Sequence, residues 1–240
     1  MGKMNFSYFE GEQRTPEWYK IRLGKVTASR LSDWLAVSKA KTGAGKPLKA
    51  RLDYEKELLF ERKFNTSFET FVSEAMQDGI DYEAYARQQY QEITGASVSE
   101  CGAWYNEYFC ASPDGVVQRA DSDGDGLLEI KIVKDNSFTE ILTSGVPDKW
   151  WKQIQGQLWA SGYQWCDFVA VNFNTRKIKI IRVTPDAEFH EWAELAIVED
   201  FNTDDSIFNT DQLYDLKELP ATAEPIAAGD AATDIKALGF

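Results

Sequence analysis

Two strand-like segments joined by a short polar turn, within residues 111–134, constrain the fold more than any other feature of the chain. In LLEIKIV the apolar residues alternate with Glu129 and Lys131, so the charged pair shares one face of a strand. The earlier segment ends in ASPDG, where Asp114 stands fifteen residues before Glu129. Pairing of the strands through the turn DSDGDG would bring Asp114 beside Glu129. Without Asp114, the charged pair would be an ordinary feature of a solvated sheet.

Two carboxylates on neighbouring strands, with a lysine next to them, suit a Mg²⁺ site. Mg²⁺ prefers oxygen ligands in octahedral array and keeps several of its waters. Lys131 would orient or deprotonate one of these waters, and the cation would stabilise charge on the leaving oxygen of a phosphodiester. The spacing Asp-x14-Glu-x-Lys is the signature of PD-(D/E)xK nucleases, and the proline before Asp114 is also present.

The turn itself resembles the first half of an EF-hand calcium loop. Asp121, Asp123, Asp125 and Gly126 fit loop positions 1, 3, 5 and 6, but position 12, which requires glutamate, falls on Ile132. A strand-like segment also replaces the helix that should leave such a loop. We therefore interpret DSDGDG as a hairpin turn. A non-catalytic calcium-binding module is the alternative from a different functional class.

Composition restricts the chemistry further. The one histidine, His190, lies in a polar helical segment, which argues against Ser-His-Asp, Cys-His and zinc hydrolase sites. The three cysteines lack CxxC spacing, and we interpret them as buried free thiols. The net charge of −13 argues against nucleic acid at first sight. However, residues 186–240 hold −12 of it, so residues 1–185 carry only −1 and are not strongly repelled by DNA.

The order of elements predicts one α/β domain with a mixed central sheet flanked by helices. We assign residues 1–217 to this domain, 38–51 to a mobile basic loop within it, and 218–240 to an acidic, Ala/Pro-rich, disordered tail. Helices are expected within 15–38, 53–64, 68–93 (broken near Gly79), 148–161 and 186–200, and a hairpin over 167–183. Since no apolar run approaches a membrane span and the N-terminus lacks a signal peptide, we expect a cytoplasmic protein without membrane contacts.

Two predicted helices would complete the catalytic site. Glu83, in GIDYEAYARQQY, would supply a third carboxylate. Gln155, in WWKQIQGQLWASG, would position the nucleophilic water or a metal-bound water, with Gln153 two residues earlier. Single Glu and Gln residues on helix surfaces usually have no catalytic role. Their place in the chain order Glu, Asp, Glu-x-Lys, Gln-x-x-x-aromatic supports the assignment.

In combination, these motifs resemble those of the phage lambda-type exonucleases, the YqaJ-like viral recombinase branch of the PD-(D/E)xK fold. The resemblance runs from about Trp18 to Val183, and its motifs are EWYKIRLGKVTAS, DYEAYAR, CASPDG, LLEIK and QIQGQLW. It implies a restriction-endonuclease-like core, in which Lys131, assisted by Gln155, activates the attacking water. The implied metal ligands are Glu83, Asp114, Glu129 and the main-chain carbonyl of Ile130.

The same resemblance implies several contacts with DNA. Arg22, Ser29 and Ser112 would form a pocket for the 5′-phosphate of the digested strand, which fits the fork geometry of a guanidinium on phosphate oxygens. Met76 would be an apolar wedge at the terminal base pair, although a buried core methionine is the alternative. The residues that would contact phosphates of the incoming duplex are Lys39, Lys41, Lys46, Lys49 and Arg51.

The activity implied is that of a Mg²⁺-dependent 5′-to-3′ exonuclease. It would digest one strand of linear double-stranded DNA from a 5′-phosphorylated end, release 5′-mononucleotides and leave 3′ overhangs for phage-type homologous recombination. The resemblance further implies two Mg²⁺ ions per site, with Mn²⁺ as a substitute, and a homotrimeric ring. It also implies a single-strand annealing protein as partner and a phage or prophage origin in a bacterial host. The rival is an endonuclease of the same fold, restriction- or resolvase-type, which would not need the terminal phosphate pocket.

Overall fold

The structure is a computed structural model that describes residues 4–42, 44–68, 74–119 and 124–202, with the backbone alone for 74–81. These residues belong to one compact unit. Since residues 203–240 lie outside the described part, the boundary at 217/218 and the tail stay predictions. No helix of the described part is long and apolar enough to cross a membrane.

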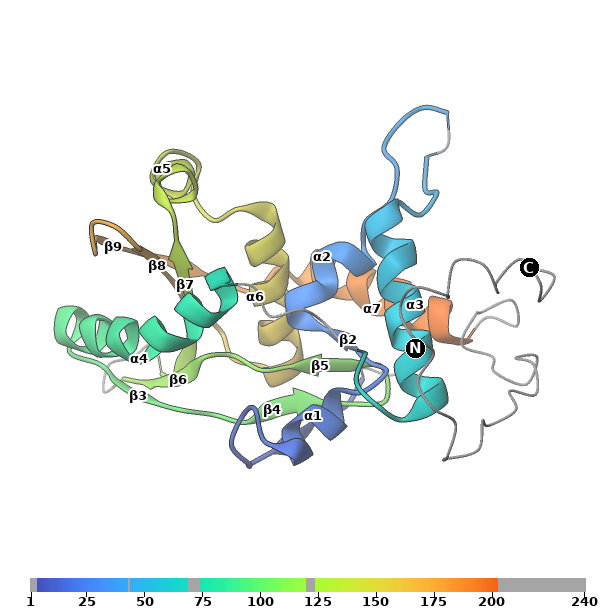
Figure 1. Ribbon diagram of the computed structural model, residues 1–240, viewed down its shortest axis with the longest axis horizontal. Helices are drawn as coiled ribbons and strands as arrows, with labels where there is room; N and C mark the ends of the chain where they lie inside the picture. Colours follow the sequence, from blue (N-terminus) through green and yellow to red (C-terminus); the bar gives the residue numbers. More distant parts are fainter. Residues whose placement is uncertain (1–3, 43, 69–73, 120–123, 203–240) are drawn as a thin grey trace, which may run out of the picture. The chain divides into compact units, whose positions relative to one another are not determined.

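A five-stranded mixed sheet forms the centre of the fold (Figure 1). Its order is β3-β6-β7-β8-β9, and only the β7–β8 pair is parallel. The predicted mixed sheet is thereby confirmed. The strands are β3 (Ser97–Ser99), β6 (Gly115–Gln118), β7 (Gly126–Val133), β8 (Cys166–Asn172) and β9 (Ile178–Val183).

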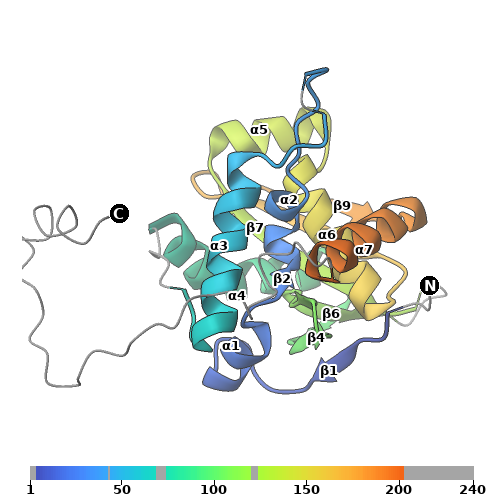
Figure 2. The same cartoon turned by 90° about the vertical axis from the view of Figure 1, so that its right-hand side faces the viewer.

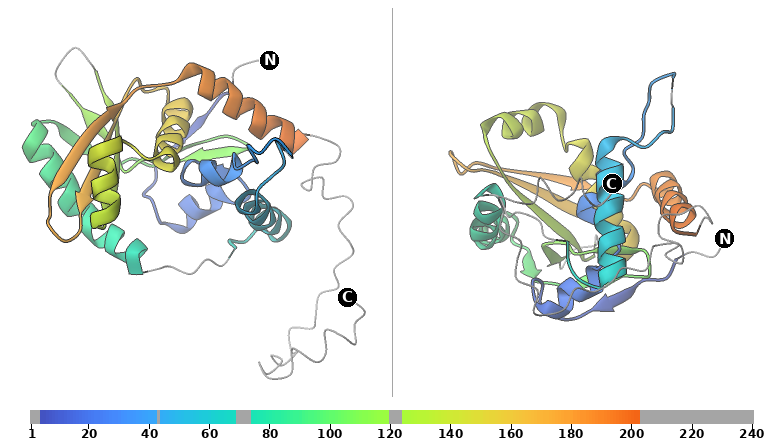
Figure 3. Two further views of the ribbon diagram at one scale, coloured as in Figure 1. Left: turned by 90° about the horizontal axis from the view of Figure 1, so that it is seen from above. Right: turned by 45° about the vertical axis from the view of Figure 1, so that its right-hand side comes forward.

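Helices cover both faces of this sheet (Figures 1 and 3). Helix α4 (Glu74–Thr94) packs its Tyr90 with Leu128 and Ile130 of β7. Helices α5 (Asp135–Ser144) and α6 (Asp148–Ser161) cover the opposite face, where Leu127 and Val133 contribute to the core. The alternation of LLEIKIV therefore places Glu129 and Lys131 on the α5/α6 face, and this face is buried by helices instead of being solvated.

A second, smaller sheet has the order β1-β4-β5-β2. Figure 2 shows the molecule from the side of helices α3 (Lys49–Phe64) and α1 (Pro16–Arg22), next to this second sheet. A large apolar cluster joins β2 and β5 to helices α2, α3, α6 and α7, with Trp34, Phe109 and Ile197 fully buried. The elements are β1 (Ser7–Phe9), β2 (Val26–Thr27), β4 (Ala103–Tyr105), β5 (Phe109–Ala111), α1 (Pro16–Arg22), the 3₁₀ helix η1 (Ala28–Arg30), α2 (Leu31–Trp34), α3 (Lys49–Phe64) and α7 (Ala187–Asn202).

Gly156 lets α6 approach this cluster closely. A Cβ atom at this position would lie 2.8 Å from Phe109 Cζ and 3.1 Å from Leu31 Cδ2. Since real Cβ atoms do not approach other atoms so closely, any side chain here would push α6 away from β5 and α2. The glycine of the motif QIQGQLW thus sets the distance between the helix and the second sheet.

Several predicted elements differ in detail from the structure. The segment YFCASPDGVVQR contains two strands, β5 and β6, because the chain leaves one sheet at residues 112–114 and joins the other. The helix over 68–93 is not broken near Gly79, since α4 is continuous over Glu74–Thr94. Helix α5 was not predicted. The helix over 148–161 and the hairpin over 167–183 are confirmed by α6 and by the pairing of β8 with β9.

The segment with calcium-loop character connects β6 to β7 as a hairpin. Val117 pairs with Gly126 and Gly115 with Leu128, so a strand follows the connection where an EF-hand requires a helix. This confirms the interpretation as a hairpin turn. Residues 120–123, which include Asp121 and Asp123, lie outside the described residues.

Candidate active site

The β6–β7 hairpin brings Asp114 and Glu129 together as predicted. Asp114 N donates a 3.0 Å hydrogen bond to Leu128 O, and Asp114 Oδ2 accepts a 2.6 Å bond from Ile130 N. The carboxylate of Asp114 is therefore fixed against the backbone of the strand that carries Glu129. Residues fifteen positions apart meet because a single hairpin connects them.

Glu129 is buried, with 1% of its surface exposed, and is held by three donors. Lys131 Nζ lies 2.5 Å from Glu129 Oε1. Gln153 Nε2 donates to Oε1 and Gln157 Nε2 donates to Oε2, both at 2.6 Å. Hydrogen bonds of this length and number are strong, so these three donors fix the orientation of the buried Glu129 carboxylate.

The surroundings of Asp114 and Lys131 shift the pKa of both groups. Burial raises the pKa of Asp114 well above its usual range, the nearby Glu129 raises it further, and Lys131 opposes the shift. Burial lowers the pKa of Lys131, but the carboxylates of Glu129 and Asp114 outweigh this effect and the pKa is raised overall. Lys131 is thus an ammonium group in this state, and a cation placed beside Asp114 would relieve the repulsion between the carboxylates.

Glu83 reaches the site from α4. Its two carboxylate oxygens each lie 2.7 Å from a guanidinium nitrogen, Oε2 from Arg14 Nη2 and Oε1 from Arg87 Nη2. Glu83 lines the same cleft as Asp114 and Lys131. The third carboxylate of the sequence prediction is therefore near the other two, and in this structure it is held by two arginines.

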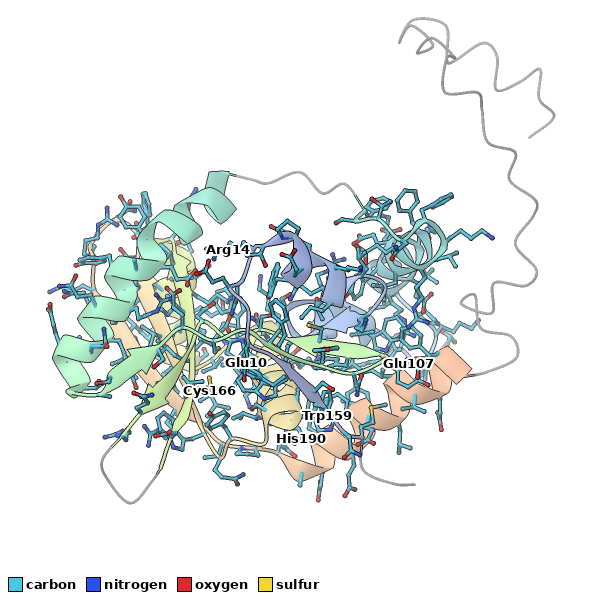
Figure 4. The ribbon with its side chains drawn as sticks, turned by 90° about the horizontal axis from the view of Figure 1, so that it is seen from below. Glu10, Arg14, Glu107, Trp159, Cys166 and His190 are labelled. Carbon is cyan, nitrogen blue, oxygen red and sulfur yellow. The ribbon has the colours of Figure 1, made fainter. Side chains whose placement is uncertain are left out.

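Gln155 does not enter the site, in contrast to the prediction. Its Nε2 donates to Thr184 O at 2.9 Å, and its Oε1 lies 2.9 Å from Asp186 N and 2.8 Å from Nε2 of His190 on α7 (Figure 4). On a helix, residues two apart point in different directions, whereas residues four apart share a face. The glutamines that contact Glu129 are accordingly Gln153 and Gln157, and their spacing of four was the signal in the sequence.

The three residues expected to bind a terminal phosphate lie around one small cavity of about 140 Å³. Arg22 Nη1 donates to Ser112 Oγ at 3.1 Å, as does Trp18 Nε1. The Arg22 guanidinium stacks on the Trp18 ring, 4.1 Å from its centroid. Ser29 completes the lining, and the structure thus brings Arg22, Ser29 and Ser112 together from α1, η1 and the start of the catalytic strand pair.

A larger cleft of about 640 Å³ connects this region to the catalytic residues. Asp114, Ile130 and Lys131 lie along it, and so do Phe68 and Ser67 from the segment after α3. Besides Lys131, the cationic residues that line it are Arg14, Arg22, Lys25 and Arg30. A cleft lined by Asp114 and by several cations suits an anionic polymer bound next to a hydrolytic centre.

The predicted basic loop is anchored at its base. Ser38 N donates to Lys46 O at 2.8 Å and Leu48 N to Ala36 O at 2.9 Å, so the segment leaves and rejoins the body as a narrow hairpin above α3 (Figure 1). The lysines of the predicted range 38–51 are all exposed: Lys39, Lys41, Lys46 and Lys49. Lys49 is the first residue of α3, and its Nζ lies 2.5 Å from Oδ2 of Asp53, four residues later in the helix. Their contact with DNA stays a prediction.

Arg51 is not available to DNA, which corrects the prediction. It lies within α3, not in the loop, and its side chain is only 7% exposed. Its guanidinium stacks on the Trp34 ring at 3.5 Å, donates to Trp34 O and pairs with Glu55 and Asp200. Met76 lies in α4, but its side chain is outside the described part, so its role as wedge or core residue stays a prediction.

The donor set fits a hard divalent cation. Within the described ranges, no three His, Cys, Asp or Glu side chains are grouped closely enough to form a metal site by themselves. Mg²⁺, however, is commonly bound by one or two carboxylates and otherwise by water and substrate phosphate. Asp114 and Glu129, with the main-chain carbonyl of Ile130 next to Glu129 on β7, are oxygen donors of this type. Binding of Mg²⁺ or Mn²⁺ stays a proposal.

A mixed sheet with helices on both faces, whose central hairpin carries Asp114, Glu129 and Lys131, defines a nuclease of the PD-(D/E)xK class. Residues 17–164 match the model of the YqaJ-like viral recombinase domain. The chain therefore belongs to the YqaJ-like viral recombinase family, and it is a nuclease hydrolase related to alkaline exonucleases.

Solved structures agree with this assignment. The alkaline exonuclease LHK-Exo from Laribacter hongkongensis is 33% identical, with a TM-score of 0.64 over 77% of this chain and 89% of that one. The same enzyme in complex with dAMP is 34% identical, with a TM-score of 0.62 over 76% and 89%. A phage-related exonuclease from Haemophilus somnus 129PT shares the fold at 16% identity, with a TM-score of 0.54 over 72% and 90%. A search of curated proteins finds no significant match.

Proposed function

We propose that this nuclease is a Mg²⁺-dependent 5′-to-3′ exonuclease that digests one strand of linear double-stranded DNA from a 5′-phosphorylated end. The observation that carries the proposal is the position of the Arg22–Ser112 pocket, which shares Arg14 and Arg22 with the cleft of Asp114 and Lys131. A terminal phosphate in the pocket would place the first phosphodiester beside the carboxylates. An endonuclease would have no use for a pocket of this kind.

The residues of the site divide the work of hydrolysis. A bound divalent cation would supply a water of lowered pKa and neutralise charge on the phosphodiester. Asp114 and Glu129 would hold this cation, and Gln153 and Gln157 keep Glu129 in its orientation. Lys131, an ammonium group next to Glu129, would orient the attacking water and offset the negative charge that develops on the phosphate. The products would be a 5′-mononucleotide and a shortened strand. LHK-Exo has been crystallised with dAMP, a nucleotide of this kind.

The polarity is tested with linear duplex DNA labelled at one 5′ end or one 3′ end, in the presence of Mg²⁺. Early release of the 5′ label as a mononucleotide, with faster digestion of 5′-phosphate than 5′-hydroxyl ends, is the expected result. Release of the 3′ label first, or cutting of closed circular DNA, would contradict the proposal. Omission of Mg²⁺, or its replacement by Mn²⁺, tests the cation in the same assay.

The expected assembly is part of this proposal. Membership in a viral recombinase family supports a role in homologous recombination together with a single-strand annealing protein, in a phage or prophage within a bacterial host. A homotrimeric ring around DNA would make digestion processive. Light scattering on the purified protein tests the trimer, and a mass of one or two chains would contradict it.

A further inference from the structure

Arg14 lies where three hollows of the site meet. It lines the small cavity with Arg22 and Ser112, the large cleft with Asp114, and a third cavity of about 210 Å³ next to Arg87. Figure 4 shows Arg14 on the segment before α1, beside α4. The guanidinium thus stands between the phosphate pocket and the catalytic carboxylates, a position that the sequence motifs did not single out.

The backbone holds Arg14 in an unusual conformation. Its φ of 67° lies in the left-handed region, which residues other than glycine rarely adopt. On one side, Gln13 Nε2 donates to Pro113 O at 2.7 Å and Cys101 O at 2.9 Å. On the other side, the Thr15 hydroxyl caps α1. Disfavoured backbone that is fixed by its surroundings is typical of active sites. The bond from Gln13, the residue before Arg14, ties this segment to Pro113 and so to the neighbour of Asp114.

The side chain of Arg14 is free to change its partner. Among the described residues its one hydrogen-bond partner is Glu83, with Nη2 at 2.7 Å from Oε2, and its side chain is 47% exposed. Arg87 is different, because it is 13% exposed and bonds at once to Glu83, Glu100 and the carbonyl of Asp114. Arg87 would thus still pair with Glu83 after Arg14 has left, whereas the more exposed pair of Arg14 and Glu83 is weak and easily exchanged.

We propose that Arg14 is a second phosphate-binding arginine of the cleft, which leaves Glu83 and contacts a non-bridging oxygen of the scissile phosphodiester when DNA is bound. This inference rests on the proposed nuclease function and extends it to a further substrate contact. A guanidinium presents paired donors that match phosphate oxygens. Arg22 and Ser112 already occupy the neighbouring pocket, so Arg14 is left for the next phosphate, and its departure frees one oxygen of Glu83.

DNA binding without turnover tests the contact. In the Lys131→Ala background, Arg14→Ala should raise the Kd for linear duplex DNA about tenfold. The slope of log Kd against log salt should fall by about 1, because one phosphate contact is lost. Lys20→Ala is the matched control, since Lys20 is exposed on α1, lines none of the three cavities and removes the same charge. Arg14→Lys should keep most of the salt slope and lose part of the affinity.

Two further arms separate contact from positioning. The Arg14→Ala effect should persist in a Glu83→Gln background, where a role through Glu83 alone would make it vanish. It should also persist on 5′-hydroxyl DNA, where a role at the terminal phosphate would make it vanish. The inference is overturned if the effect is lost in either arm. It is also overturned if Arg14→Ala binds DNA like Lys20→Ala, or if the Lys131→Ala background protein does not bind duplex DNA. Failure of the wild type to hydrolyse DNA overturns the proposed function, and this outcome is read in a separate assay.

Discussion

Gln157 Nε2 donates a 2.6 Å hydrogen bond to Oε2 of Glu129, a carboxylate that is 1% exposed. Gln153, one helical turn earlier, donates to the other oxygen of the same carboxylate. Helix α6 thereby binds both oxygens of the Glu129 carboxylate on β7 through an i, i+4 pair of glutamines. The structural element that buries the sheet also orients its active carboxylate.

Gln157→Ala should therefore lower kcat for DNA hydrolysis by about 10- to 100-fold, the usual range when a group that orients a metal-binding carboxylate is lost. Gln155→Ala is the comparison on the same helix. Because Gln155 bonds to Thr184, Asp186 and His190 instead, it should lower the free energy of unfolding by about 1–3 kcal/mol and change kcat little. Steady-state kinetics and urea unfolding of both variants check this. Equal losses of kcat would contradict the assignment.

A buried ionic network connects helix α4 to strands β8 and β9 of the central sheet. Asp167, 3% exposed on β8, accepts from Tyr90 Oη at 2.7 Å and from Arg182 at 2.8 and 3.0 Å. Asp167→Asn should cost about 2–3 kcal/mol of unfolding free energy, since charged hydrogen bonds are lost within the core while Arg182 keeps partial solvent access. Tyr90→Phe, which removes one hydroxyl, should cost about 1 kcal/mol. An Asp167→Asn protein as stable as wild type in urea would show that the network contributes nothing.

The three cysteines should resist alkylation in the folded protein. All are buried free thiols, as predicted, and burial raises the pKa of Cys101 to about 12 and raises those of Cys110 and Cys166 as well. Since only the thiolate reacts, iodoacetamide at pH 8 should label the native protein far more slowly than the urea-unfolded chain.

The same shifts link stability to pH. The pKa of a buried thiol is higher in the folded protein than the ordinary thiol pKa of 9.0. Its contribution to the unfolding free energy is therefore fully present below pH 9 and is lost as the pH rises through the pKa of the folded state. The unfolding free energy should thus fall above pH 9, and less so in a Cys→Ala triple variant. Rapid labelling of any cysteine in the native protein at pH 8 would be inconsistent with this account.

Short-range patterns in the sequence predicted much of the site. The period-2 alternation of LLEIKIV and the turn after β6 fix the pairing of Asp114 with Glu129, because a hairpin is a local structure. Helix α6 followed from apolar residues at three- and four-residue spacing. The resemblance to a family then grouped Arg22, Ser29 and Ser112, which no local rule would have brought together.

The remaining features depend on contacts that sequence spacing does not encode. The order of motifs in the chain predicts Gln155, whereas the direction of α6 relative to β7 decides that Gln153 and Gln157 contact Glu129. The basic run predicts that Arg51 contacts DNA, but its burial depends on Trp34 and on Asp200, which lies 149 residues away. Tertiary packing of this kind buries an arginine whose charge alone would suggest a contact with DNA.

The most direct test of the central claim is mononucleotide release from 5′-phosphorylated linear duplex DNA by wild type, Lys131→Ala and Asp114→Asn, with Mg²⁺ present. If the β6–β7 hairpin is the catalytic centre, wild type should release nucleotides and each variant should lose activity by at least about 100-fold, since each removes charge stabilisation of the transition state. Lys20→Ala should retain activity. Digestion by Lys131→Ala or Asp114→Asn at the rate of wild type would place the chemistry elsewhere in the molecule.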